Sequence, residues 1–217
     1  MTKLIKFFAI VTFFAALPSN SMAQEPAIMA QVRKNYSGSG ALNASFDLSI
    51  YWSVREREEK KSGELAVASG DRFRVSLGKE IFVSDGKTYW QYSEKNSQVV
   101  VRNFSDIDAA TLPSKFLMSF MSTRKFEEKK RENGTVELAW KGGGKDTYSD
   151  GYTAITAVVD EKNAIIKVLK LTDKNENINT YTFKKTVFDK SPKDGVFQFT
   201  APKGVEVLDM RENNAPN

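Results

Sequence analysis

The chain has no cysteine and no histidine among its 217 residues. Without cysteine there can be no disulfides, so stability must come from packing and from hydrogen-bonded strands. The absence of both residues excludes Ser-His-Asp and Cys-His nucleophile pairs, and it excludes the usual zinc sites. It also removes the side chain that ordinarily titrates near neutral pH. We therefore expect a binding protein rather than an enzyme, with no metal and no cofactor.

One enzymatic alternative rests on Asp146 and Asp150, which could approach each other as paired carboxylates. Both flank a predicted hairpin turn, where aspartate usually stabilises the turn itself. The formal net charge of +5 could favour anionic lipid surfaces or an acidic partner. A solvated, lysine-rich surface explains the charge equally well, and no nucleic-acid-binding motif is present.

The first residues have the pattern of a secretory signal peptide. Lysines precede an apolar run from Phe7 to Leu17, and a small-residue cleavage site ends at Ala23. The run is too short for a bilayer core that needs roughly 20 residues. We predict a cleaved signal over residues 1–23, a single domain over 24–211 and a flexible tail over 212–217.

The stretch from Gly63 to Tyr92 is typical of antiparallel strands with one apolar face. Apolar and polar residues alternate through Leu65–Leu77, the period of two that places one face of a strand on a core. The Asp-Gly pair at Asp85 suits a tight hairpin turn between the next two strands. The charge run Arg55–Lys61 is expected to be a solvated connection between strands.

The whole pattern predicts a mainly β (α+β) protein. We count about ten or eleven strands and two or three short helices, the first over Pro26–Tyr36. So large an antiparallel sheet must curl or split, and its apolar face must be covered. It is either a filled barrel or sandwich, or an incomplete antiparallel barrel with an apolar cavity under a short-helix lid. The segment Ser105–Met121 loses the period of two and is either an ordinary packed helix or that lid.

Two segments carry a resemblance to a known family. IFVSDGKTYWQY (Ile81–Tyr92) and FQFTAPKGVEVLD (Phe197–Asp209) resemble the LolA family of periplasmic outer-membrane lipoprotein carriers. The resemblance implies the incomplete barrel with a helical lid. It also implies a monomer in the periplasm that takes triacylated lipoproteins from an inner-membrane ABC transporter, shields their acyl chains and passes them to an outer-membrane receptor. A sensor of lipids or lipoproteins, or a glycolipid carrier of the same fold, is the alternative.

The acyl-chain cavity is expected where apolar strand residues face the lid. The expected lining residues are Leu65, Val67, Phe73, Val75, Phe82, Trp90, Phe116, Leu117, Phe120 and Met121. Each could instead be an ordinary core residue. The family commonly carries an arginine that ties the lid to the sheet, and the matching position here is Ser69. Because Arg72 and Arg74 should point outward by alternation, the lid is expected to depend more on apolar contacts.

Overall fold

The computed structural model describes residues 25–38, 40–107, 117, 120–121, 124–142 and 151–211. The predicted signal peptide, the predicted tail, Phe116 and the aspartates Asp146 and Asp150 lie outside these ranges. Within them, no helix has both the length and the apolar character needed to cross a membrane.

The described chain is mostly strand, with one α-helix and short 3-10 turns. The helices are α1 (Ala27–Gly38), η1 (Ser53–Arg55), η2 (Phe104–Asp106) and η4 (Asp194–Phe197). The strands are β1 (Ala41–Trp52), β2 (Arg57–Ala68), β3 (Arg72–Leu77), β4 (Glu80–Asp85), β5 (Thr88–Ser93), β6 (Gln98–Asn103), β7 (Glu127–Glu132), β8 (Thr135–Lys141), β9 (Tyr152–Asp160), β10 (Ile165–Asp173), β11 (Ile178–Asp189) and β12 (Glu206–Asp209).

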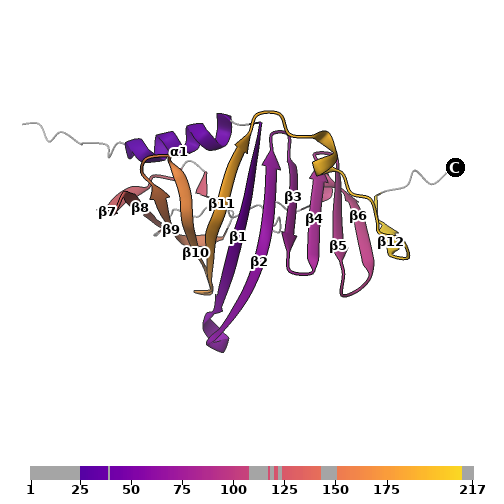
Figure 1. Cartoon of the computed structure of the whole chain (residues 1–217). Coiled ribbons are helices and arrows are strands. Elements are labelled where there is room, and N and C mark those ends of the chain that lie inside the picture. Colours follow the sequence, from indigo (N-terminus) through magenta and orange to yellow (C-terminus); the bar gives the residue numbers. More distant parts are fainter. Residues whose placement is uncertain are drawn as a thin grey trace, which may run out of the picture.

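The strands form a single open sheet, so the predicted incomplete barrel is confirmed. The order is β12-β6-β5-β4-β3-β2-β1-β11-β10-β9-β8-β7, with β12 and β7 at the two edges. The sheet has twelve strands, slightly more than expected, and β12 pairs with β6 in parallel while the other pairs are antiparallel. Figure 1 shows the sheet curling from β12 around to β7, with α1 beside the ends of β9 to β11.

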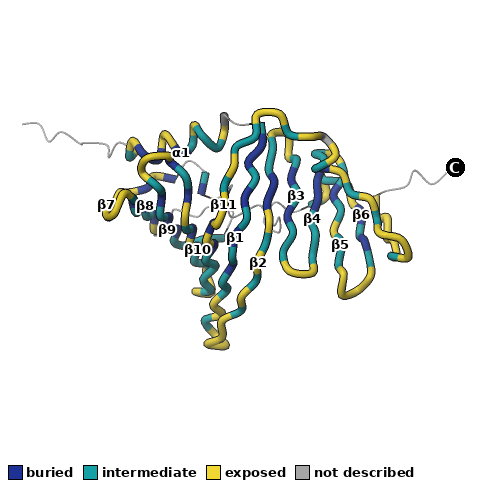
Figure 2. Tube along the Cα trace, in the orientation of Figure 1, coloured by how far each residue is buried: buried dark blue, intermediate teal, exposed yellow. Residues whose placement is uncertain are grey.

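The predicted Asp-Gly turn and the first helix lie where they were expected. The chain turns at Gly86, which has a positive φ as an Asp-Gly pair favours, and a similar turn with positive φ lies at Gly134 after Asn133. The charge run is the exception, because Arg57–Lys61 belongs to β2 rather than to a connection. Its charged side chains are tolerated because this part of β2 projects beyond most of the sheet, and none of Arg57–Lys61 is buried (Figure 2).

The sheet has two distinct faces, because residues paired across antiparallel strands point the same way. We call the face that carries Leu48, Leu65 and Phe73 the inner face. Its residues form the main core together with Ile28, Met29 and Val32 of α1. The opposite, outer face is covered in part by η4, whose Phe197 packs on Ala41 and Ala66.

Candidate functional site

The inner face carries most of the strand residues predicted to line a cavity. Pairing places Val67 opposite Phe73 and Leu65 opposite Val75, and Val75 in turn lies opposite Phe82. Leu65, Phe73 and Val75 are buried, whereas Val67 and Phe82 are partly buried and packed against the same core. The alternation read from the sequence therefore identifies residues that share one apolar surface.

Trp90 does not share that surface, which corrects the prediction. It pairs with Val83 on β4 and with Val101 on β6, and Val83 pairs with Arg74. Since no bulge interrupts these pairings, Trp90 and Arg74 lie on the outer face while Phe82 lies on the inner one. Phe82 and Trp90 are both even-numbered and eight residues apart. In β4 the even-numbered residues face the core, but after the hairpin the odd-numbered residues of β5 do.

The inner face is covered near α1 by described residues from the end of the predicted lid and from the segment that follows it. We call Leu117, Phe120, Met121, Arg124 and Phe126 the covering residues, of which Arg124 and Phe126 lie beyond the predicted lid. Phe120 is fully buried, and its ring centroid lies 5.0 Å from that of Phe126. The Met121 N–H donates to the Leu117 carbonyl oxygen at 2.9 Å, which is one helical turn. Leu117, Phe120 and Phe126 therefore belong to the core, and Met121 packs against it.

A predominantly apolar cavity of about 410 Å³ lies between α1, β1 and the covering residues. It is lined by Arg33, Tyr36, Ser37, Leu42, Leu117 and Met121. Leu117 and Met121 were predicted for such a cavity, and both lie in its wall. The other described residues of the predicted lining do not line it. Its volume lies within the range of about 300–1,000 Å³ that is usual for small-molecule sites.

Arg33 connects α1 to the covering residues at the edge of this cavity. Its Nη1 donates to the Met121 carbonyl oxygen at 2.5 Å, and its Nη2 donates to the Arg124 carbonyl oxygen at 3.3 Å. Its Nε donates to Glu25 at 2.8 Å. One guanidinium therefore bridges two carbonyls of the cover, which suits its planar, multiple-donor geometry. Little in the sequence signals this role, because Arg33 looks like an ordinary surface residue of a short helix.

Arg124 fixes the cover from the other side. It is only 1% exposed, and its guanidinium carbon lies 4.4 Å from the centroid of the Trp140 ring. Contacts of this kind between a desolvated cation and a tryptophan face contribute about 2 kcal/mol. The cover is thus attached to β8 through Trp140 and to α1 through Arg33.

Tyr36 forms the part of the cavity wall nearest β10. Its hydroxyl oxygen accepts a hydrogen bond from the Ile166 N–H at 3.1 Å, and its ring packs edge-on against Phe188. Burial raises the pKa of the Tyr36 phenol to about 12, although the Ile166 N–H opposes part of this rise. Tyr36 is therefore neutral at ordinary pH, and it contributes no charge to the cavity wall.

Ser69 lies in the exposed turn between β2 and β3. The hydrogen bond that involves it uses its backbone carbonyl, which accepts from Arg72 Nε at 3.0 Å. Arg72 also lies over the ring of Phe197 at 5.3 Å, and Arg74 Nη1 donates to the Gln198 carbonyl at 3.4 Å. Both arginines therefore point outward, as alternation predicted, and they hold the C-terminal segment on the outer face.

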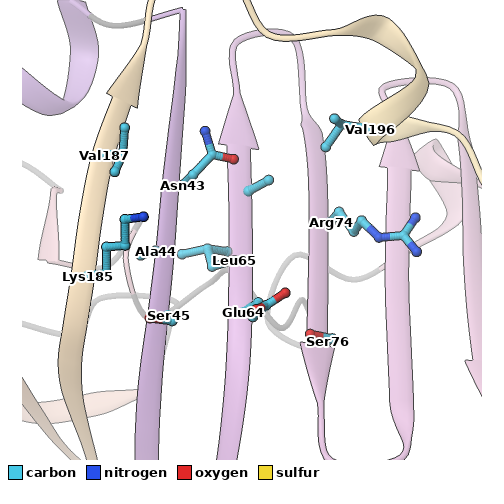
Figure 3. Close-up of a pocket in the computed structure, with 11 residues that line it drawn as sticks. Asn43, Ala44, Ser45, Glu64, Leu65, Arg74, Ser76, Lys185, Val187 and Val196 are labelled. Carbon is cyan, nitrogen blue, oxygen red and sulfur yellow. The ribbon is translucent and has the colours of Figure 1, made fainter.

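A second hollow of about 500 Å³ lies on the outer face (Figure 3). Asn43, Ser45, Glu64, Arg74, Ser76 and Lys185 supply its polar side chains, and Val196 of η4 closes one side. Although it is the larger hollow, its charged and hydroxyl groups would have to lose water to hold an alkyl chain. The cavity under α1 is the better candidate for an apolar ligand.

The sequence is similar to one family of known proteins. The family model described as outer membrane lipoprotein carrier protein LolA matches residues 39–200. The outer-membrane lipoprotein carrier protein of Chromobacterium violaceum is 24% identical over 204 residues, which is 93% of this chain and 97% of that protein. The corresponding protein of Vibrio campbellii is 26% identical over 219 residues, covering 95% and 96%.

A solved structure is similar to most of this fold. The crystal structure of an uncharacterized conserved protein from Thermus thermophilus aligns with a TM-score of 0.53 at 14% identity. The alignment covers 84% of this chain and 96% of that one. At this identity the similarity concerns the fold alone.

Proposed function

Because the chain belongs to the LolA family of outer membrane lipoprotein carrier proteins, we propose that it carries lipoproteins across the periplasm by shielding their acyl chains. The observation that supports this most directly is the apolar cavity of about 410 Å³ between α1 and the covering residues. We further propose that cargo comes from an inner-membrane ABC transporter and goes to an outer-membrane receptor.

Acyl chains need such shielding because water opposes their exposure. Each exposed methylene costs about 0.8 kcal/mol, so a chain of sixteen carbons costs on the order of 12 kcal/mol. A lipoprotein with several chains cannot cross an aqueous compartment unaided at a useful rate. A carrier that covers the chains with non-directional apolar contacts removes this cost and can still release them.

The cavity borders a larger apolar surface, because its wall residues Leu42 and Leu117 belong to the core of the inner face. It is smaller than three acyl chains require, since a single drug-sized ligand already fills a cavity of this class. Uptake of a triacylated group therefore needs the cover to move away from α1 and to uncover inner-face residues such as Leu65, Phe73 and Phe82. The contacts made by Arg33 hold the cover closed when no cargo is bound.

Transfer from spheroplasts tests the proposal. The purified protein without its signal peptide is incubated with spheroplasts that synthesise a triacylated lipoprotein, and the soluble fraction is analysed for a complex. A stoichiometric complex supports the carrier function. If the folded protein releases no lipoprotein but binds isolated glycolipids, the alternative of a glycolipid carrier or a lipid sensor is favoured instead.

A further inference from the structure

The β1–β2 hairpin ends in a tip, residues 51–57, that exposes apolar side chains. Val54 is 89% exposed, Tyr51 is 39% exposed and Trp52 is 37% exposed. Figure 1 shows that this tip extends beyond the other turns at the same end of the sheet, and Figure 2 shows its exposure. Isolated exposed apolar residues are common, but three within four residues at a projecting point indicate a contact surface.

The tip is held in place by the neighbouring β10–β11 turn. The Ser53 N–H donates to Asn177 Oδ1 at 3.1 Å, and Ser53 Oγ donates to the Asn175 carbonyl. That turn is itself ordered by Asp173, whose carboxylate accepts from the Asn175 and Asn177 N–H groups at 2.7 and 3.0 Å. Because the tip is already ordered, little further conformational entropy is lost when it makes a contact.

We propose that this tip inserts into the head-group region of a phospholipid bilayer. Tryptophan and tyrosine are the residues that favour the membrane–water interface. Val54 is the apolar side chain that would reach the edge of the acyl-chain region. Arg55 and Arg57 lie on either side of Glu56, and long arginine side chains can reach lipid phosphates while their stems stay in apolar surroundings. The attachment requires no cargo and goes beyond the carrier function.

The charges behind the tip are compatible with an anionic lipid surface. Glu58 lies 3.3 Å from the Lys60 ammonium, and Glu59 lies 3.0 Å from the Lys61 ammonium. Hydrogen bonds from Ser49 and Lys60 lower the pKa of Glu58, and the Lys61 ammonium does the same for Glu59. These carboxylates are ionised but locally compensated, so they do not oppose the two arginines at the tip.

The shape and size of the tip favour a bilayer over a protein partner. Whole aromatic side chains bury about 150–250 Å² each, and only fractions of Tyr51 and Trp52 are exposed. The available area is therefore well below the roughly 800 Å² per partner of a stable protein interface. A narrow convex point suits a soft surface that can close around it, and weak insertion allows the protein to leave again.

Binding of the purified, signal-free protein to vesicles of phosphatidylethanolamine and phosphatidylglycerol tests this inference. The wild type should float with the vesicles, and brominated acyl chains should quench part of its tryptophan emission. Val54→Asp should reduce the bound fraction about fivefold or more without altering the thermal unfolding transition, because the side chain makes few contacts in the folded protein. Trp52→Phe should lose the bromolipid quenching but retain flotation.

Val207→Asp is the matched control, because Val207 is also an exposed valine, 52% exposed, but lies on β12 far along the sheet from the tip. It should bind vesicles as the wild type does. Equal flotation of Val54→Asp and wild type, or an equal loss in Val207→Asp, would overturn the inference. Absence of wild-type flotation would also overturn it. If Val54→Asp floats normally but is defective in transfer from spheroplasts, the tip docks to a membrane protein instead of the bilayer.

Discussion

Replacing Arg33 with methionine should loosen the cover over the cavity. The substitution keeps much of the aliphatic stem but removes the donors to the Met121 and Arg124 carbonyls. Hydrogen bonds from charged donors contribute about 1.5–3 kcal/mol each, but the Arg33 side chain is 24% exposed and water replaces part of them. We therefore expect a total loss of about 1–3 kcal/mol, which raises the opening equilibrium about 5- to 150-fold.

Hydrogen exchange at the Met121 amide measures those openings that also break its hydrogen bond to the Leu117 carbonyl within the cover. Exchange in Arg33→Met should accelerate by up to the same factor, while amides of β1 and β11 should not change. By linkage, a protein that opens more easily also binds cargo more tightly and releases it more slowly.

Arg72→Met is the matched control, because Arg72 is a partly exposed arginine that also donates to a backbone carbonyl but lies on the outer face. It should leave Met121 exchange unchanged. If exchange in Arg33→Met equals that of the wild type while the fold is intact, Arg33 does not hold the cover, and the role given to its two hydrogen bonds is refuted.

Other consequences can be tested with the same protein. Phe82→Ala should weaken lipoprotein uptake whereas Trp90→Ala should not, because the two aromatic residues occupy opposite faces; an equal effect in a spheroplast release assay would contradict the assignment of the faces. Ser69→Ala should change stability by less than about 0.5 kcal/mol, measured by urea unfolding, and should not alter transfer, since the hydrogen bond at Ser69 uses the backbone. Cargo binding should be constant from about pH 6 to about pH 8, because the chain lacks histidine. The Tyr36 pKa is raised from 10.0 to about 12, so its contribution to stability is complete below pH 10.0 and is lost as the pH rises toward about 12. If the thermal unfolding temperature did not fall across that pH range, the burial of Tyr36 would be contradicted.

The strand residues of the inner face could be predicted because a local sequence pattern, the alternation of apolar and polar residues, indicates which of them are buried. Leu65, Phe73 and Val75 alternate with polar residues, and alternation fixes which residues share a face within a strand. Trp90 could not be assigned in this way. Its face depends on the register across the hairpin, which a pattern within one strand does not determine.

The contacts that hold the cover could not be predicted from the sequence. Arg33 lies 88 residues from Met121, and nothing near either residue indicates that they meet. The same holds for Arg124 and Trp140, whose contact depends on how the cover and β8 lie in the folded protein. The hairpin tip was missed for a different reason: the charge run of Arg55–Lys61 looks like a connection, although most of it extends β2.

The removal of triacylated lipoproteins from a membrane is the central step that we propose for this protein. The most direct measurement is the amount of lipoprotein that the purified, signal-free protein releases from spheroplasts into a soluble complex. We expect a stoichiometric complex, which Phe82→Ala weakens and Trp90→Ala leaves unchanged. No soluble lipoprotein in the presence of folded protein and actively synthesising spheroplasts would contradict the proposal.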